Sequence, residues 1–231
     1  MLGVLRYLGG HLMYLGGNGF YWVNAMDSAQ PHLVEVRRGL NGTRSWTSAP
    51  GETRLSLTGE IGGLWRNRGR FPNKLVGNGF AAQGWDAGAN YIRLPDSHDP
   101  HAAFVFEGIS DDEVIGNFGI VGNGAAGDEV DRYDLDLGTP PETLRLATSE
   151  GQHSDAYQLV IEDTESSEAH WGGTSCRKVR ADMVYLEPAG GGAVFSVGSI
   201  NWIASLPHNN FANNVARITG NVLRHFTTPL P

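Results

Sequence analysis

The chain has 231 residues, and 32 of them are glycine, about 14% against a usual share of about 7%. Hydrophobic residues make up 40% of the chain and aromatic residues 10%, which is enough for a buried core and excludes disorder and collagen-like repeats. The formal net charge of −8 argues against nucleic-acid partners, and the single cysteine excludes an intrachain disulfide.

Neither a membrane span nor a secretion signal is visible. The apolar stretches are interrupted well before the roughly 18 residues that a spanning helix needs. Residues 1–15 lack the basic start and the small-residue cleavage site of a signal peptide. Cys176 has no histidine at the spacing of a catalytic dyad, and we interpret it as inert. We therefore expect a cytoplasmic protein with many tight turns.

The chain opens in a helical pattern rather than with polar residues. Apolar positions recur at helical spacing over 1–8, and Gly9-Gly10 would end that helix. Residues 11–15 (HLMYL) then predict a buried strand, followed by a sharp turn at 16–19 (GGNG). Helix, strand and turn are typical of the second half of an α/β unit, so we expect a chain that starts in mid-fold and is truncated at its N-terminus.

Further elements follow along the chain. Apolar alternation and runs of β-branched residues predict strands at 32–37, 91–94, 183–186 and 193–197. Near the end, Asn209 or Asn210 is a candidate cap for a helix whose apolar positions recur at helical spacing, namely Phe211, Val215, Ile218, Val222 and Phe226. Strands that alternate with a few helices indicate an α/β fold with inserted β structure.

Residues 149–180 are the most polar section of the chain, with the run EDTESSE at 162–168. We interpret this section as a flexible surface excursion. The rest of 1–231 is expected to form one domain around it.

The turn at 16–19 resembles a nucleophile elbow, in which a tight glycine-flanked turn exposes a Ser or Cys. The elbow position is Asn18, which is no nucleophile. Either the turn is architectural, or the Asn18 side chain lines a pocket. Tyr21 borders the same turn and is a second candidate for substrate binding, whereas Tyr14 and Tyr185 lie within apolar runs and are expected in the core.

Five acidic residues fall within nine positions beside a Gly/Ala-rich loop, namely Asp128, Glu129, Asp131, Asp134 and Asp136. Their order does not match a calcium loop, which places oxygen ligands at alternate positions around a glycine. Two interpretations stay open: a solvated acidic turn, or a segment in which one acid is a general base or orients a metal-bound water.

His98 and His101 are separated by Pro100, which indicates a turn rather than one face of a helix. Two histidines without a clear third ligand do not make a zinc site, so we predict no metal here. Arg66, Arg68 and Arg70 either bind an anion or pair with the acids of the chain itself.

Several blocks taken together resemble one family, the large subunit of N,N-dimethylformamidase and the bacterial proteins that share its C-terminal domain. The blocks occur in the same order and cover nearly the whole chain, with 149–180 matched only weakly. They are MYLGGNGFYW (13–22), GEIGGLWR (59–66), SHDPHAAFVFEGI (97–109), GAAGDEVDR (124–132) and AVFSVGSINWIASL (193–206).

The resemblance implies an α/β domain similar to class I glutamine amidotransferases, with flavodoxin-like layers and without their catalytic cysteine. Asn18 at the elbow position agrees with that loss. The resemblance also implies hydrolysis of the C–N bond of dimethylformamide to formate and dimethylamine by a mononuclear non-haem iron. In the family, two tyrosines and the glutamate of a His-Pro-Glu-Tyr motif hold that iron.

This sequence departs from the family at the metal. His-Pro-Glu does not occur in it, and its first residue lies just after the place where that motif would stand. We therefore expect no cofactor to be retained in this chain. Glu129 matches a family glutamate near the iron but outside its ligands, and the resemblance implies that Glu129 is a base.

Three readings follow. In the first, the chain is the C-terminal domain of an amide hydrolase, inactive alone, which completes a site for a small amide substrate when joined to its missing half. In the second, it is a non-catalytic binding or assembly module of a homo- or hetero-oligomer, with exposed aromatics such as Trp65 and Trp85 at the interface. In the third, it is an independent hydrolase that uses Glu129 with His98.

Overall fold

The computed structural model describes residues 9–38, 49, 51–160 and 170–228. The chain divides into two compact units. The first comprises residues 1–19 and 73–231, and the second comprises residues 20–72. The helix that the sequence predicts over 1–8 lies outside the described residues, as does the whole acidic run at 162–168.

A five-stranded sheet forms the centre of the first unit. Its strands β1 and β10 run parallel, with Met13 opposite Phe195, and every other pair in the sheet is antiparallel. In spatial order, the strands are β1 (His11–Tyr14), β10 (Ala193–Ser196), β9 (Asp182–Leu186), β7 (Leu144–Thr148) and β5 (Ile92–Arg93).

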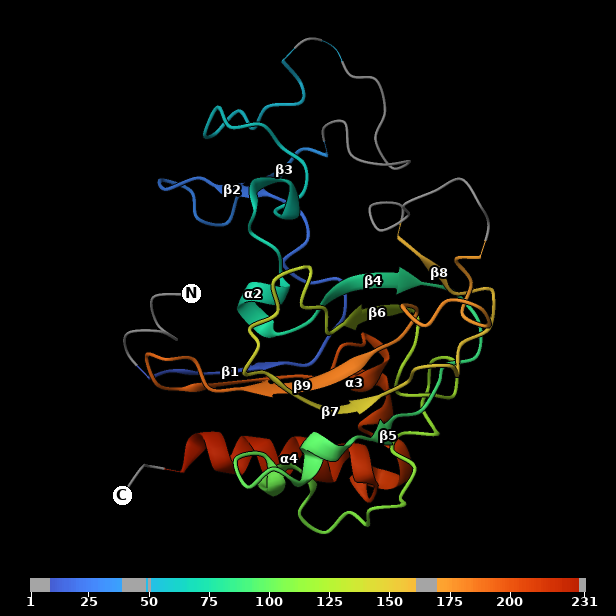
Figure 1. The fold of residues 1–231 in the computed structure, drawn as a ribbon. Coiled ribbons are helices and arrows are strands. Elements are labelled where there is room, and N and C mark those ends of the chain that lie inside the picture. Colours follow the sequence, from blue (N-terminus) through green and yellow to red (C-terminus); the bar gives the residue numbers. More distant parts are fainter. Residues whose placement is uncertain (1–8, 39–48, 50, 161–169, 229–231) are drawn as a thin grey trace. The chain divides into compact units, whose positions relative to one another are not determined.

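A smaller antiparallel sheet lies over this one in the first unit (Figure 1). It consists of β6 (Glu129–Arg132), β4 (Gly79–Gln83) and β8 (Gln158–Leu159), with β4 in the centre. Apolar side chains of both sheets, among them Ala82, Val130, Met183 and Phe195, belong to one buried cluster. This cluster fixes the position of β6 against the central sheet.

Helix α4 (Asn214–Thr227) covers the other face of the central sheet (Figure 1). Its cap is Asn213, whose side chain accepts a hydrogen bond from the backbone N–H of Ala216. Val215, Ile218 and Val222 recur at helical spacing and are wholly buried.

The remaining helices of the first unit are short. The α-helices are α2 (Asn73–Val76) and α3 (Asn201–Ser205), and the 3₁₀ helices are η3 (Pro95–His98), η4 (Ala103–Phe106) and η6 (His208–Phe211). In the described part of the chain, no helix is both long and apolar enough to cross a lipid bilayer.

The second unit has a small core of its own. Strands β2 (Asn24–Met26) and β3 (Val34–Val36) pair antiparallel, and the 3₁₀ helix η2 spans Arg66–Arg68. Val23, Ala25 and Leu55 are buried together, with Trp65 packed against them. Arg68 pairs with Glu60 at 3.1 Å and lies over the Trp65 ring, as Arg70 does. For Arg68, pairing with an acid of the chain itself is thus confirmed.

The predicted fold class is wrong. The described structure is mostly β-sheet, and it is not the flavodoxin-like α/β fold of class I glutamine amidotransferases. That fold needs parallel strands joined by helical crossovers, but among the described strands only β1 and β10 pair in parallel. Among the described residues, the helices that stand between strands are η2, α2, η3 and η4, of three or four residues each, which is too short for crossover helices.

Most of the individual strand predictions are confirmed, although the fold class is wrong. Strands are confirmed within 11–15, 32–37, 91–94, 183–186 and 193–197. The predicted cap of the last helix is wrong: Asn209 and Asn210 lie in the left-handed region at φ 49° and 51°, and Phe211 is exposed in η6 rather than on α4. Strands β4, β6 and β7 were not predicted. The assignment of 1–231 to one domain, with 149–180 as an excursion, stays a prediction.

Candidate functional site

The candidate site lies at the carboxyl ends of β1 and β10. Because these two strands are parallel, the loops that follow them leave the sheet at the same edge. Val197 N–H donates to the Tyr14 carbonyl at 3.1 Å, and Asp131 N–H donates to the Gly198 carbonyl at 2.9 Å. The second bond brings β6 to this edge.

The turn after β1, which we call the Asn18 turn (residues 15–19), depends on its glycines. Asn18 adopts the left-handed conformation at φ 60°, which asparagine tolerates better than most residues. A Cβ atom on Gly17 would overlap the Glu129 carbonyl, and one on Gly19 would overlap the Tyr14 hydroxyl. The glycine-rich pattern is therefore needed because the turn packs directly against β6 and β1.

The side chain of Asn18 contacts Glu129. The Nδ2 atom of Asn18 donates to Oε1 of Glu129 at 2.8 Å, and the Glu129 side chain is partly exposed. Within the described residues, the other carboxylate oxygen of Glu129 accepts no hydrogen bond. The Oδ1 atom of Asn18 is buried and has no donor among them either. A buried acceptor without a donor costs about 1–3 kcal/mol, so a donor placed against this atom would be stabilising.

Asp131 holds the turn from beneath. Its side chain is wholly buried; Oδ1 accepts from the Asn18 backbone N–H at 2.7 Å and Oδ2 from the Tyr14 hydroxyl at 3.1 Å. The Tyr14 oxygen accepts in turn from the Gly19 N–H at 2.5 Å. Tyr14, Asn18, Gly19 and Asp131 thus form one continuous hydrogen-bonded network.

Burial dominates the electrostatics of this network. It raises the pKa of Asp131 to about 7, against the opposing effect of the hydrogen bonds from Asn18 and Tyr14. Burial and the nearby charge of Asp131 raise the pKa of Tyr14 above its usual range, so this phenol is neutral. Among the described residues, Asp131 forms no ion pair with a cationic side chain.

The structure brings two of the four predicted site residues together. Glu129 and Asn18 are in direct contact. Tyr21 lies in the second unit, 5% exposed, with its ring edge-on to Trp22. His98 is exposed at the end of η3, and its Nδ1 lies 3.9 Å from Asp111. Roles for Tyr21 and His98 stay predictions; no hydrogen bond or ion pair in the described part of the chain joins His98 to Glu129.

Sequence reasoning missed the roles of Tyr14 and Asp131. Tyr14 was expected in the core, but it is only partly buried and its hydroxyl bonds to Asp131. Glu129 and Asp131 belong to strand β6 rather than to a solvated acidic turn. Their spacing of two places both on one face of a strand, which is the signal that could have linked them.

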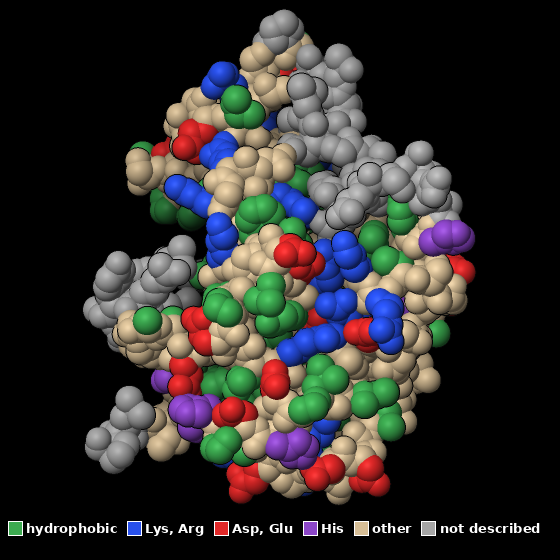
Figure 2. Space-filling view, in the orientation of Figure 1, with side chains coloured by type: hydrophobic (Ala, Val, Ile, Leu, Met, Phe, Trp, Pro, Cys, Tyr) green, Lys and Arg blue, Asp and Glu red, His purple; other side chains and the backbone are tan. Residues whose placement is uncertain are grey.

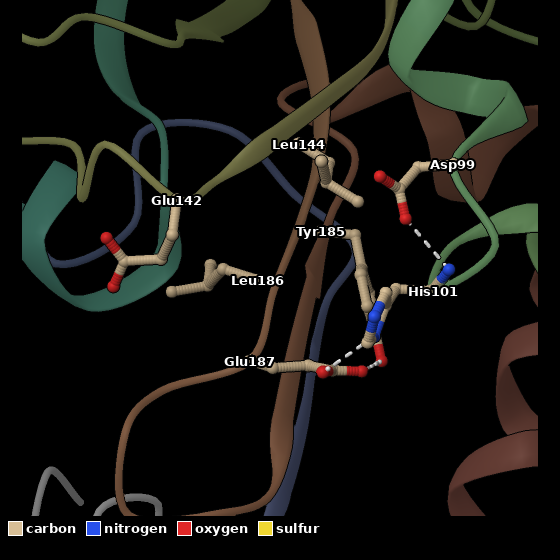
Figure 3. Close-up of a pocket in the computed structure, with 7 residues that line it drawn as sticks. All are labelled: Asp99, His101, Glu142, Leu144, Tyr185, Leu186 and Glu187. Atoms are coloured by element: carbon tan, nitrogen blue, oxygen red, sulfur yellow. Dashed lines mark hydrogen bonds and ion pairs between the residues drawn. The ribbon is translucent and has the colours of Figure 1, made fainter.

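A cleft of about 260 Å³ lies beside β7 and β9 (Figure 3). Tyr185, which is buried as expected, donates to Glu187 at 2.8 Å, and the His101 ring contacts the other Glu187 oxygen at 3.2 Å. Burial raises the pKa of Tyr185. In Figure 3 these three side chains converge, whereas Glu142 lies apart from them. The polar side chains at the centre of this cleft, Tyr185, Glu187 and His101, are therefore hydrogen-bonded to one another.

Several basic side chains form ion pairs with acidic side chains of the same chain. Figure 2 shows Lys and Arg side chains gathered on one face with Asp and Glu among them. Arg145 and Arg177 both pair with Glu150, at 3.3 and 3.1 Å, and Arg180 pairs with Asp182 at 2.9 Å. Each of these three arginines thus pairs with an acid of the chain itself.

Comparison with known proteins places the chain in a family. Residues 4–214 match the family model described as N,N-dimethylformamidase beta subunit-like, C-terminal. The chain belongs to this family. The N,N-dimethylformamidase beta subunit of Paracoccus aminophilus is 44% identical over 223 residues, and that of an Alcaligenes species is 42% identical over 223 residues.

The match is unequal in coverage. It includes 96% of this chain but only 29% of the length of either relative. Both relatives are named as beta subunits, which confirms the resemblance seen in the sequence blocks. Because the match covers less than a third of each relative, it does not by itself assign the activity of the relatives to this chain.

The iron that the resemblance implies does not fit the donor set at the Asn18 turn. Tyr14 is a neutral phenol committed to Asp131 and Gly19, and both oxygens of Asp131 accept hydrogen bonds. Across the part of the chain that the structure describes, no group of three or more His, Cys, Asp or Glu side chains is arranged to hold a metal ion.

Proposed function

We propose that this domain contributes one wall of an active site that hydrolyses a small N-substituted formamide to formate and an amine. The observation that carries the proposal is the Asn18–Glu129 pair, in a chain that belongs to the N,N-dimethylformamidase beta subunit-like family. Glu129 is the group in this pair that can move a proton.

Glu129 would act as general base and then as general acid. One of its oxygens is held by Asn18, which leaves the other to accept a proton from an attacking water molecule. The water oxygen bonds to the formyl carbon, the C–N bond breaks, and the proton passes to the leaving nitrogen. The buried Oδ1 atom of Asn18 would accept a hydrogen bond from that water.

We also propose that the chain is inactive alone. Its family members extend well beyond the matched region, because the chain spans only 29% of their length. The described residues include Glu129 as a proton-transfer group, but no group of three or more His, Cys, Asp or Glu side chains among them is arranged to hold a metal ion. The remaining polypeptide would complete the site and the subunit assembly that the name of the relatives indicates.

A hybrid protein tests both proposals. The chain would replace the matched 223 residues of the Paracoccus aminophilus beta subunit, and formate release from dimethylformamide would be measured for the hybrid and for the chain alone. We expect turnover in the hybrid and none above background in the chain. Tightly bound stoichiometric iron with turnover in the chain alone would contradict its inactivity.

The role of Glu129 is tested in the same hybrid. We expect Glu129→Gln to lower kcat by a factor on the order of 10²–10⁴, the usual contribution of a positioned acid–base group. Asp128→Asn is the matched control, since it makes the same charge change one residue earlier and Asn tolerates the left-handed φ of 54° found there. Equal activity in the two variants would remove Glu129 from the reaction.

Exposed apolar side chains favour a second candidate function, a binding or assembly module. Trp85 is 73% exposed and Ile120 is 77% exposed, whereas Trp65 is shielded by its own unit. Light scattering on the purified chain would test this reading. We expect self-association that Trp85→Ser weakens and that Leu135→Ser, at an exposed position elsewhere, does not; a monomer at all concentrations would count against self-assembly.

A further inference from the structure

Asp131 takes no part in the proposed proton transfer, yet it lies at the centre of the network beneath Glu129. Each of its oxygens accepts from a neutral donor, and both donors are in or next to the Asn18 turn. We infer that Asp131 and Tyr14 are positioning residues: ionised Asp131 holds the Asn18 turn closed so that Asn18 contacts Glu129, and protonation of Asp131 loosens the turn.

The directions of the hydrogen bonds carry the argument. The Asn18 N–H and the Tyr14 O–H both point their protons at the carboxylate, and the Gly19 N–H points at the Tyr14 oxygen. The Asn18 N–H and the Tyr14 O–H therefore depend on Asp131 as their acceptor, and the Gly19 N–H depends on it through the Tyr14 hydroxyl. The two bonds from the backbone N–H groups of Asn18 and Gly19 fix the peptide groups on either side of Asn18.

An added proton reverses one of these contacts. If it binds Oδ2, that oxygen becomes a donor facing the Tyr14 hydroxyl; if it binds Oδ1, it faces the Asn18 N–H. In either case one acceptor of the turn is lost. Because Asn18 reaches Glu129 through a single 2.8 Å bond, a shift of the turn would break that contact.

Among the described residues, four titratable groups surround Asp131 on β6 and the neighbouring elements. Tyr14 on β1 is a neutral phenol, and Tyr91, which is buried beside the sheet edge, donates its hydroxyl to the Val197 carbonyl. Glu129 on β6 adds a like charge that disfavours ionisation of Asp131. On β9, Asp182 is paired with Arg145 and Arg180. Burial places the pKa of Asp131 at about 7.

This inference rests on the proposed function only for its consequence, which is that the proposed base would be held in place above the midpoint and released below it. The behaviour of the turn itself can be measured without turnover. A failed hydrolase assay would leave it standing, and a turn that ignores pH would leave the proposed role of Glu129 intact.

The test is an NMR titration of the purified 231-residue chain from pH 5 to pH 9. We expect the side-chain amide signals of Asn18 to shift with a midpoint near pH 7. Exchange of the Gly19 amide with solvent, corrected for the intrinsic effect of pH, should be about tenfold or more faster at pH 5 than at pH 8.5, because the closed turn protects it.

Four variants separate the groups. Asp131→Asn should abolish the midpoint near pH 7 in the Asn18 signals, whereas Asp128→Asn should leave it unchanged. Glu129→Gln should move the Asn18 signals and lower their midpoint without abolishing it, because the like charge beside Asp131 is removed. Tyr14→Phe removes one donor to the ionised carboxylate, so it should raise the midpoint and speed Gly19 exchange.

Three results would overturn the inference. The first is a midpoint that survives in Asp131→Asn, and the second is one that disappears in Glu129→Gln, which would assign the titration to Glu129. The third is a Tyr14→Phe variant with an unchanged midpoint. This variant retains the carboxyl, so it decides the matter if Asp131→Asn fails to fold.

Discussion

Asp131 on β6 and Asp182 on β9 are both wholly buried carboxyl groups, but their surroundings differ. Asp182 accepts from the guanidinium groups of Arg145 at 2.7 Å and Arg180 at 2.9 Å, from the Thr148 hydroxyl and from the Tyr133 backbone. Asp131 accepts only from neutral donors, Tyr14 and Asn18, among the residues that the structure describes.

The difference separates a structural charge from one suited to function. Two cations and two further donors offset the loss of hydration at Asp182, which makes this ion-paired group a fixed part of the sheet. At Asp131 nothing of that strength offsets it, and its pKa rises to about 7. A buried carboxyl whose charge changes near neutral pH, beside a partly exposed carboxylate and a buried amide oxygen without a donor among the described residues, is typical of a functional site.

The largest expected effect is the loss of the compensated charge. Asp182→Ala leaves Arg145 and Arg180 without their shared acceptor, and we expect it to lower the free energy of unfolding by about 3–5 kcal/mol. Denaturant unfolding at pH 7.5 measures this, with Asp112→Ala on the exposed surface as a control expected to change stability by less than about 0.5 kcal/mol. Equal effects would refute the structural role of Asp182.

Asp131, whose charge is not compensated by a cation, should instead make the free energy of unfolding depend on pH. The pKa of Asp131 is about 7 in the folded chain and about 3.9 when unfolded, so between these values the folded state binds more protons and its stability falls as pH rises. Asp131→Asn removes this contribution. We expect the stability of the variant relative to wild type to increase from pH 4 to pH 7.5, by at most about 4 kcal/mol.

Unfolding curves of both proteins at several pH values check this prediction. The comparison must be a difference between variant and wild type, because burial lowers the pKa of His153 to about 4 and gives an opposite slope below pH 6.5. A difference that is flat with pH would show that Asp131 is ionised throughout, like an ordinary surface acid.

The close packing of the Asn18 turn gives a smaller effect. Gly19→Ala places a methyl group on the Tyr14 hydroxyl, and we expect a loss of about 1–3 kcal/mol in the free energy of unfolding. Gly220→Ala, inside α4 and next to only the flexible Arg224 side chain, should stabilise by about 0.5–1 kcal/mol. Thermal unfolding of the two variants should therefore shift in opposite directions; a shared direction would contradict the packing at Gly19.

The Tyr14 hydroxyl is expected to contribute least. Tyr14→Phe removes the bonds to Asp131 and Gly19 while keeping the ring, which should cost about 1–2 kcal/mol. Tyr21→Phe is the matched control in the other unit. If Tyr14→Phe were as stable as wild type, the hydroxyl would not support the turn.

The sequence predicted the parts of the site that depend on local chemistry. Glycines around Asn18 indicated a tight turn, and the family resemblance pointed to Glu129. The burial of Asp131 could not be predicted, because it depends on β6 packing beside the loop after β10, far away in the chain. The acids flanking Asp131 favoured a solvated interpretation instead.

The fold class failed for a related reason. Local patterns located β1, β9 and β10 but do not say whether neighbouring strands run parallel or antiparallel. The resemblance implied a flavodoxin-like fold with parallel strands, and the antiparallel pairing of β9 with β10 and with β7 contradicts it. The family assignment was confirmed while the fold expected from it was wrong.

The most direct test of the contrast between the two buried acids is the ¹³C chemical shift of the Asp131 carboxyl carbon, followed from pH 4 to pH 9 in the purified chain. We expect a single transition with a midpoint near pH 7, absent from the spectrum of Asp131→Asn. A midpoint at or below about 4, the usual value for an aspartate, would contradict the uncompensated burial of Asp131 and the pH-dependent turn that rests on it.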